Sequence, residues 1–240
     1  MSRRLDVPDT VRTTTTLDPV PAYLRSHYWW AYVHPNAVRF WEREWLVNLI
    51  LWQNYRRLSE AALNALGESL PGRTLQIDCV YGDLTARLSR RAEAAGGTID
   101  VVDVLPVQLE NLRQKLPDNA PVRRLLRNSE DMALPSASYD RVLLFFLLHE
   151  QPEDVRRRTL AEAMRVVRPG GSVVIVDYAQ PSPWHPAKYL WLPVLRVLEP
   201  FARDLWQRDL TAWLPEPWAS RKLNRTRFFG GLYQMLCITG

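Results

Sequence analysis

The sequence predicts a doubly wound α/β fold, in which helices cover both faces of a largely parallel sheet. Short apolar runs rich in β-branched residues alternate with helical patterns through the middle of the chain. The strand-like runs are continuously apolar, which is typical of strands buried on both faces. The 240 residues, 47% hydrophobic and 24% charged, are enough for a large domain with a real core, and they exclude a disordered or fibrous chain.

The elements of the central unit follow one another in a regular order. The predicted strands cover residues 73–79, 98–104, 122–126, 141–148 and 172–177. The predicted helices cover residues 83–95, 107–116 and 153–167. Pro71-Gly72, Gly96-Gly97, Pro117 and the turn at 169–171 separate these elements, since proline and glycine end helices and favour turns.

The tryptophans divide the chain into regions, because none of the ten lies between Arg73 and Ala179. We expect a flexible N-terminal segment over residues 1–22, an aromatic helical cap over 23–72 and the α/β domain over 73–240. Within that domain, a proline-rich region at about 180–225 is expected to form a substrate or membrane lid.

A single helix is predicted over residues 36–58, with Trp41, Trp45 and Trp52 on one face and arginines around it. Tryptophan with arginine suits a membrane interface. An ordinary amphipathic helix docked on the sheet explains the pattern equally well.

Charge, cysteine content and hydropathy limit the possible partners and the cellular compartment of the protein. The net charge of +5 fits phosphate groups, nucleic acid or anionic lipid, so its sign selects no partner. Cys79 and Cys237 are too few for a disulfide scaffold and indicate a reducing compartment. We expect neither a transmembrane helix, which needs about 18 apolar residues, nor a secretion signal.

Polar residues follow each predicted strand, at the edge of a parallel sheet where ligands bind. They are Asp78, Asp103, residues 128–131, His149 with Glu150, and Asp177 with Tyr178. A carboxylate after the second strand of such a sheet typically binds ribose hydroxyls, so Asp103 is the strongest candidate for a nucleoside contact. The alternative is that Asp103 only caps the next helix.

Three further segments carry a resemblance to a known family. The segments LPSASYD, EAMRVVRPGGSVVIVDYAQP and FFGGLYQML resemble class I S-adenosylmethionine-dependent methyltransferases, particularly the ubiquinone/menaquinone C-methyltransferase group. The resemblance implies a Rossmann-like sheet of seven strands that ends in an antiparallel hairpin. It also implies that S-adenosylmethionine contacts Asp78, Tyr81, Gly82, Asp103, Val104, Asn128, Ser129 and Glu130.

The loop after the first strand departs from that family. Its members carry a Gly-x-Gly-x-Gly turn there, whereas residues 78–83 read Asp-Cys-Val-Tyr-Gly-Asp and keep only the last glycine. Glycine supplies positive φ and room. We therefore expect Val80 and Tyr81 to narrow the pocket where the methionyl group normally lies, while the adenosine half binds as usual.

This loop and the aromatic N-terminal segment together resemble the rhodoquinone biosynthesis proteins, a divergent branch of the same family. The resemblance implies that ubiquinone becomes rhodoquinone when an amino group replaces a ring methoxy group. S-adenosylmethionine would supply the nitrogen, and manganese(II) would assist. Ubiquinone lies in the bilayer, so the expected partner is the membrane surface and not nucleic acid. The expected location is the cytoplasmic face of the inner membrane, or the mitochondrial inner membrane in a eukaryote.

Exchange of a ring substituent by addition and elimination needs a base and a proton donor. Tyr81 and His149 are the candidate catalytic residues, although each could equally be structural. Asp78, Asp83, His149, Glu150 and Asp177 suit a divalent metal, but no spacing motif singles out a ligand set.

Two other functions fit the sequence. One is an ordinary S-adenosylmethionine-dependent methyltransferase acting on a quinone or lipid precursor. The glycines missing from the loop after the first strand argue against this function. The other is a non-catalytic quinone-binding protein on a methyltransferase fold. The residues of the predicted nucleoside site argue against this function. Nucleic-acid modification fits least, because the aromatic flanks contain aliphatic runs and no basic stripe.

Overall fold

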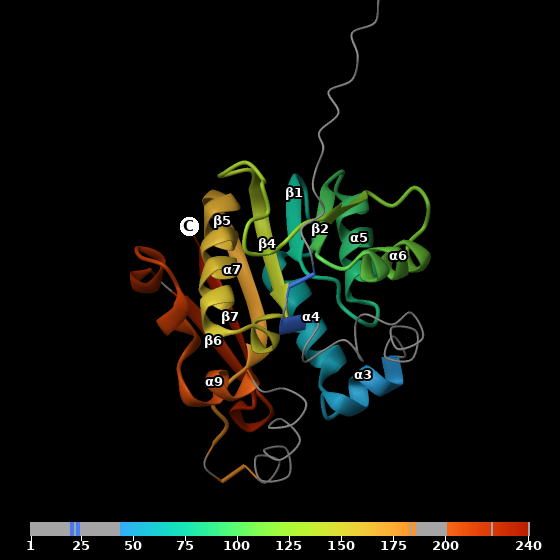
Figure 1. The fold of residues 1–240 in the computed structure, drawn as a ribbon. Helices are drawn as coiled ribbons and strands as arrows, with labels where there is room; N and C mark the ends of the chain where they lie inside the picture. Colours follow the sequence, from blue (N-terminus) through green and yellow to red (C-terminus); the bar gives the residue numbers. More distant parts are fainter. Residues whose placement is uncertain are drawn as a thin grey trace, which may run out of the picture.

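The computed structural model describes residues 20–21, 23–24, 44–182, 184–185, 201–221 and 223–239. Its centre is a seven-stranded sheet with the order β3-β2-β1-β4-β5-β7-β6 (Figure 1). The strands are β1 (Arg73–Ile77), β2 (Thr98–Asp103), β3 (Val122–Leu126), β4 (Tyr139–Phe145), β5 (Val167–Tyr178), β6 (Leu223–Phe228) and β7 (Tyr233–Thr239). Strands β1 to β5 pair in parallel, and β7 is antiparallel to both β5 and β6. The predicted fold class and the closing hairpin are confirmed.

The α-helices are α3 (Glu44–Ile50), α4 (Tyr55–Leu66), α5 (Leu84–Ala94), α6 (Pro106–Lys115), α7 (Glu153–Val166) and α9 (Ala202–Gln207). Short 3-10 helices form η2 (Leu148–Glu150), η3 (Leu210–Trp213), η4 (Trp218–Ser220) and η5 (Phe229–Gly231). The strand order reverses between β1 and β4, because the chain continues from β1 to β2 and β3 on one side and later adds β4 and β5 on the other. The carboxyl ends of β1 and β4 therefore flank the crevice where this class of sheet binds ligands.

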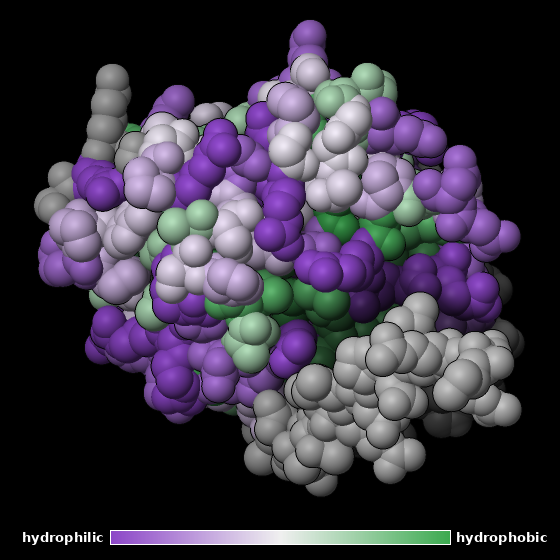
Figure 2. Space-filling model, turned by 90° about the horizontal axis from the view of Figure 1, so that it is seen from above, coloured by the Kyte–Doolittle hydropathy of each residue, from purple (hydrophilic) through white to green (hydrophobic). Residues whose placement is uncertain are grey.

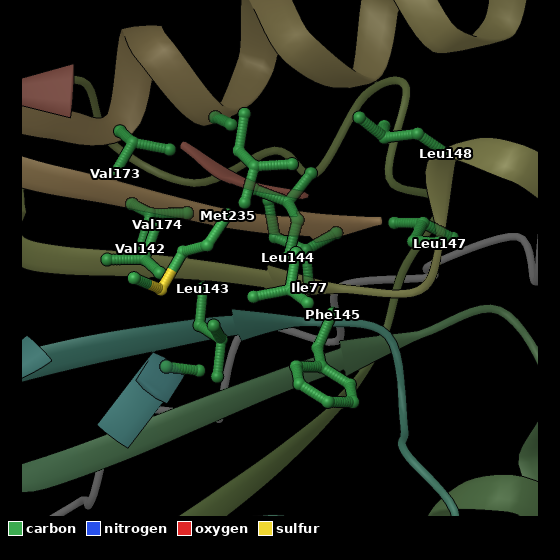
Figure 3. Close-up of a cluster of buried hydrophobic side chains, with 14 of the residues drawn as sticks. Ile77, Val142, Leu143, Leu144, Phe145, Leu147, Leu148, Val173, Val174 and Met235 are labelled. Carbon is green, nitrogen blue, oxygen red and sulfur yellow. The ribbon is translucent and has the colours of Figure 1, made fainter. Parts of the chain in front are cut away.

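The core lies on both faces of the central strands. Four consecutive residues of β4, Val142 to Phe145, are buried, so the side chains on each face of the strand are covered. Figure 3 shows them packed with Ile77 of β1, Val173 and Val174 of β5, and Met235 of β7. This burial explains why the strands appear in the sequence as unbroken apolar runs.

The helix predicted over residues 36–58 is interrupted. Helix α3 ends at Ile50 and α4 begins at Tyr55, because Trp52 and Gln53 between them adopt positive φ values of 52° and 61°. Trp45 is exposed, whereas Trp52 packs against the core, so these two side chains do not share a face. The prediction of one continuous tryptophan face is wrong here, and its remaining part, residues 36–43, lies outside the described residues.

Strand β5 is longer than predicted. It begins at Val167 and includes the residues predicted as a turn, with Gly170 at a φ of 77°. The pairing with β4 shifts between Tyr139 and Arg141. The turn residues are thus accommodated as an irregularity within a paired strand instead of ending it.

The flanking regions are described in part. The N-terminal segment 1–19 and residues 186–200 of the predicted lid lie outside the described residues, while α9, η3 and η4 belong to the described part of the lid region. Within the part of the chain that the structure covers, no helix is both long and apolar enough to cross a membrane.

Candidate active site

A pocket opens at the carboxyl ends of β1, β2 and β3. Five of the eight residues predicted to contact S-adenosylmethionine line it, namely Asp78, Asp103, Val104, Asn128 and Ser129. The rest of the lining is Tyr23, Leu24, Cys79, Val102, Leu105, Gln108, Arg127, Leu147 and Glu150. The pocket thus lies at the sheet edge where the strand order predicts a nucleoside site.

Asp103, the last residue of β2, joins two loops beside this pocket. One carboxylate oxygen accepts a hydrogen bond from the backbone N–H of Cys79 at 2.9 Å, and the other accepts one from the N–H of Leu105 at 2.8 Å. A carboxylate has about four acceptor directions, so these bonds leave capacity for a ligand. The contact between Asp103 and a ribose stays a prediction, and the bracing of the two loops is an additional role.

Three carboxyl groups, those of Asp78, Asp103 and Glu150, line the pocket. Burial raises the pKa of Asp78 well above its usual value, and the charges of Asp103 and Glu150 raise it further. Asp78 also has a φ of 82°, in the left-handed region that side chains rarely adopt. A pocket with this many acidic groups favours a ligand with positive charge.

Helix α6 holds the loop after β1 in place. Gln108 donates a hydrogen bond to the Tyr81 hydroxyl at 2.9 Å, and the Lys115 ammonium donates to the carbonyl oxygens of Val80 and Gly82 at 3.0 and 3.1 Å. The sequence did not single out Gln108 or Lys115. Their spacing of seven residues, which places both on one side of a helix, was the available signal.

Gly82 is retained in this loop for a steric reason. Its φ is 84°, and a Cβ there would lie 2.5 Å from the hydroxyl oxygen of Tyr55 on α4. Only glycine fits this position without displacing α4 or the loop. Tyr81 and Gly82 do not line the pocket among the described residues, and their contact with S-adenosylmethionine stays a prediction.

Glu130 is the third predicted contact outside the pocket lining. Its carboxylate accepts hydrogen bonds from Arg158 on α7 at 2.6 Å and from the side chain of Asn128 at 3.4 Å. In this structure Glu130 therefore supports the loop after β3 and pairs with α7.

Tyr23 and Leu24 of the N-terminal region also line the pocket, a contact that sequence reasoning missed. Leu24 packs with Leu105, and the ring of Tyr23 lies edge-on to Phe201 with centroids 6.5 Å apart. Burial and the nearby Glu150 carboxylate raise the pKa of Tyr23, so its hydroxyl remains protonated. No periodic pattern connects these residues to the sheet, and only Pro21 just before them marks a structural boundary.

A cluster of rings lies at the ends of β4 and β5. We call it the aromatic cluster, and it consists of Phe146, His149, Tyr178, Phe229 and Tyr233. Ring centroids within it are 5.0 Å apart for His149 and Tyr178, 5.5 Å for Tyr178 and Tyr233, and 5.6 Å for Phe146 and Tyr233. Because β7 runs antiparallel to β5, its first residue, Tyr233, pairs with the last residue of β5, Tyr178.

Within the aromatic cluster, His149 faces Asp177. Nδ1 of His149 lies 3.1 Å from Oδ1 of Asp177, a fully buried carboxylate that also accepts the backbone N–H groups of Leu148 and Tyr178 at 2.8 and 2.7 Å. A fixed carboxylate behind an imidazole orients the ring and stabilises its protonated form. The pair is therefore equipped to accept a proton from a group in the cluster.

One segment forms the wall between the pocket and the aromatic cluster. Leu147 and Glu150 line the pocket, while Phe146 and His149 belong to the cluster. Phe146 has a φ of 56°, and such strained residues are common at functional sites. The pocket and the aromatic cluster thus share one segment of five residues, 146–150. Of the two predicted catalytic residues, the structure places His149 here and holds Tyr81 against α6.

The predicted manganese ion finds no support in the described residues, because no three His, Cys, Asp or Glu side chains among them converge to hold a metal ion. Asp78 and Glu150 line the pocket, whereas Asp177 is engaged by backbone N–H groups and His149.

Comparisons with known proteins agree with this geometry. Residues 75–171 match a family model described as a methyltransferase domain. The chain is 25% identical over 173 residues to a demethylmenaquinone methyltransferase of Bacillus licheniformis, covering 70% of this chain and 72% of that one. It is 28% identical over 134 residues to the ubiquinone/menaquinone biosynthesis C-methyltransferase UbiE of Idiomarina loihiensis, covering 55% of this chain and 50% of the relative.

Solved structures show the same fold. The N-methyltransferase NodS of Bradyrhizobium japonicum superposes with a TM-score of 0.56 at 12% identity, covering 77% of this chain and 95% of NodS. An S-adenosylmethionine-dependent methyltransferase of Aquifex aeolicus gives a TM-score of 0.52 at 16% identity, covering 86% and 98%. Residues 75–171 thus resemble a methyltransferase domain, and the chain has the fold of S-adenosylmethionine-dependent methyltransferases.

Proposed function

We propose that this protein is an S-adenosylmethionine-dependent transferase that acts on a quinone ring. The observation that carries the proposal is the segment 146–150, which separates a pocket with nucleoside-site character from the aromatic cluster. A group transferred between ligands in these two places has a short distance to travel, and reacting atoms must approach to about 3–3.5 Å.

The pocket suits S-adenosylmethionine in two ways. Asp103 and Asn128 are polar groups at the strand ends where a nucleoside binds. Glu150 is a further carboxyl group in the pocket lining, which suits the positive charge of the sulfonium and ammonium groups that this ligand carries. NodS, which shares the fold, has been solved in complex with S-adenosyl-L-homocysteine.

The aromatic cluster suits a planar acceptor. Flat rings stack favourably on aromatic side chains, and His149 with Asp177 can take up a proton beside them. The names of two relatives, a demethylmenaquinone methyltransferase and a ubiquinone/menaquinone C-methyltransferase, point to quinones as the acceptor class.

Methyl transfer is the reaction that the relatives favour. A ring carbon of the reduced quinone would attack the methyl group, the carbon–sulfur bond would break, and S-adenosylhomocysteine would leave. The ring carbon would then lose its proton to His149, whose Nδ1 lies against Asp177. In this reaction His149 is the general base.

A second reaction, the replacement of a ring methoxy group by an amino group, is favoured by the loop after β1. This loop is two residues shorter than the glycine-rich turn of the family and keeps only its last glycine, Gly82. The loop and the N-terminal segment resemble the rhodoquinone biosynthesis protein RquA. The amine of S-adenosylmethionine would attack the ring carbon, a carbon–nitrogen bond would form, and the methoxy group would leave as methanol. To release a free amino group, the quinone ring would take up the two electrons of the nitrogen–Cα–H unit and become the quinol. Water would then hydrolyse the resulting imine and release the methionyl part as its 2-oxo acid.

Isotope labels distinguish the two reactions. The protein is incubated with S-adenosylmethionine labelled either at the methyl carbon or at the amine nitrogen, together with a short-chain demethylated quinol or a short-chain ubiquinone. Methyl label in the product identifies a methyltransferase, and nitrogen label identifies the amino transfer. His149→Gln is the matched control and should lose turnover while it still binds S-adenosylmethionine. Quinone binding with neither label transferred would contradict both reactions and favour a non-catalytic quinone-binding protein.

We also propose that the protein meets its quinone at a membrane surface. Trp45 and Leu49, four residues apart on α3, are 59% and 60% exposed, and Trp184 is 91% exposed. Exposed aromatic side chains on a chain of net charge +5 suit the interface of an anionic bilayer. Figure 2, which views the molecule from above and so from the end opposite α3, shows a separate recess in which hydrophobic residues lie among hydrophilic ones.

Flotation with anionic vesicles at low salt tests this proposal. The parent protein should float with the vesicles, and a Trp45→Ser/Leu49→Ser/Trp184→Ser variant should remain in the soluble fraction. Parent protein that stays wholly soluble would contradict the membrane proposal without affecting the transferase proposal.

A further inference from the structure

The hydroxyl of Tyr233 is a buried polar group that has no hydrogen-bond partner among the residues the structure describes. The residue is fully buried, and no hydrogen bond to its hydroxyl exists among the described residues. A buried hydroxyl in an apolar setting costs free energy unless something pairs with it. Burial also raises the pKa of Tyr233, so the group is a hydrogen-bond donor at physiological pH.

The Phe229 ring lies between two others in a roughly parallel stack. Its plane is inclined by 29° to Trp52 and by 19° to Tyr233, with centroids 6.3 Å away in each case. Most other ring pairs nearby meet edge-to-face, as Phe146 and Tyr233 do at 76°. The stack is thus a place in which this protein holds a flat six-membered ring.

The backbone around Phe229 is strained and able to turn. Phe229, Gly230 and Gly231 have successive φ values of 47°, 59° and 87°, and only the last two positions suit that region without cost. His185 packs edge-on against Phe229 with centroids 4.8 Å apart, and its ring lies where a Cβ on Gly230 would be. Rotation of this short segment would release the strain at Phe229 and remove its ring from the stack.

We propose that the acceptor ring binds against Tyr233 in the position that the Phe229 ring holds in this structure, and that the Tyr233 hydroxyl donates a hydrogen bond to a ring oxygen. This inference rests on the proposed function and names the residues that recognise the acceptor. Tyr233 provides the stacking surface and the donor, while Phe229 is displaced. His149 belongs to the same cluster and lies beside Tyr178, at 5.0 Å between ring centroids.

Equilibrium binding of two probes, measured calorimetrically without S-adenosylmethionine, tests the inference. One probe is a short-chain ubiquinone, and the other is a methoxylated toluene of the same size that lacks the two ring carbonyls. Tyr233→Phe should weaken binding of the quinone about five- to tenfold, since a net hydrogen bond is worth about that factor, and should leave the carbonyl-free probe unchanged. Phe229→Ala should tighten binding of both probes, because no side chain then has to leave.

Controls separate these effects from misfolding. Phe228→Ala alters the neighbouring ring, which stacks on Arg57 and not in the cluster, and should leave the affinity for both probes unchanged. Phe229→Leu replaces Phe229→Ala if the latter does not fold. S-adenosylmethionine affinity reports folding of the rest of the domain in every variant.

The possible outcomes are distinct. Equal quinone affinity of the parent and Tyr233→Phe, weaker binding by Phe229→Ala, or no binding of the quinone to the parent would each overturn the inference. Because the measurement needs no turnover, a selective loss in Tyr233→Phe upholds it even if neither isotope label is transferred. If an isotope label is transferred but Tyr233→Phe binds the quinone as tightly as the parent does, the proposed function stands and this inference fails.

Discussion

Lys115, the last residue of α6, donates a hydrogen bond from its ammonium group to the carbonyl oxygen of Val80, 35 residues earlier in the chain, at 3.0 Å. The same ammonium donates to the carbonyl of Gly82 at 3.1 Å. A loop that keeps only one of the family's glycines is thereby bound by two hydrogen bonds to a cation outside it. Charge-assisted hydrogen bonds of this kind are stronger than neutral ones.

Lys115→Met should therefore release the loop and weaken S-adenosylmethionine binding. Hydrogen bonds to charged groups contribute about 1.5–3 kcal/mol, so an affinity loss of about tenfold or more is expected, together with a lower melting temperature. Arg113→Met is the control, because Arg113 is exposed and pairs with Glu110 on the same helix. Calorimetry that finds equal affinity in both variants would show that Lys115 does not shape the pocket.

Asp103→Ala should weaken S-adenosylmethionine binding by about 1.5–3 kcal/mol through loss of charge-assisted hydrogen bonds to the ribose. It should also lower stability, because the N–H groups of Cys79 and Leu105 lose their acceptor. Asp103→Asn keeps one acceptor oxygen and should lose less stability than Asp103→Ala. A folded Asp103→Ala variant with unchanged affinity would exclude the ribose contact.

Asp78→Asn should stabilise the protein, and increasingly so as the pH rises. The carboxyl of Asp78 has a raised pKa in the folded chain, because it is buried and faces Asp103. The raised pKa contributes its full share to the free energy of unfolding below about pH 3.9, where the carboxyl is protonated in both the folded and unfolded chain. As the pH rises toward the raised pKa, this contribution falls by about 1.4 kcal/mol per pKa unit. Denaturant unfolding of the variant and the parent at a series of pH values from 4 upward measures the difference.

Asp100 provides the control of opposite sign. Burial raises the pKa of this carboxyl, but hydrogen bonds from Arg123, Tyr139 and Arg73 outweigh burial and lower it. Asp100→Asn should therefore destabilise at neutral pH, with a difference that shrinks as the pH falls through the lowered pKa. A pH-independent effect of Asp78→Asn would show that its carboxyl is not protonated preferentially in the fold.

Asp177→Asn should slow turnover. Without the carboxylate, the imidazole of His149 loses the acidic group that lies 3.1 Å from its Nδ1, so turnover should fall by about 10²-fold or more. Because the two residues act as one unit, adding His149→Gln should cost little further activity. Additive losses in the double variant would contradict a joint role.

The sheet could be predicted because its strands are buried on both faces. Val142 to Phe145 have no polar alternative to the core, so their apolar run indicates a strand wherever it occurs. The break between α3 and α4 could not be predicted, since Trp52 and Gln53 adopt positive φ without a glycine or asparagine to signal it. Tertiary packing of Trp52 against the core overrides the helical spacing there.

The candidate site could likewise be predicted only in part. Asp78, Asp103 and Asn128 follow strands, and the topology alone brings strand ends to one edge. Tyr233 was not a candidate, because its place beside Tyr178 depends on the register of an antiparallel pair. Gln108 and Lys115 were missed because their partners are a hydroxyl and two carbonyls in a loop whose course is known only from the structure.

Strand β7 lies between β5 and β6, so the end of the chain lies inside the sheet and not at its edge. The pocket and the aromatic cluster therefore draw on stretches that are far apart in the sequence. The nucleoside half comes largely from residues 78–129, whereas Phe229 and Tyr233 come from the final hairpin. If the acceptor ring binds against Tyr233 as proposed, changes in that hairpin alter which ring is accepted without disturbing the residues around the nucleoside. Exchange of the hairpin between related chains would therefore be an economical route by which one donor site acquires new acceptors.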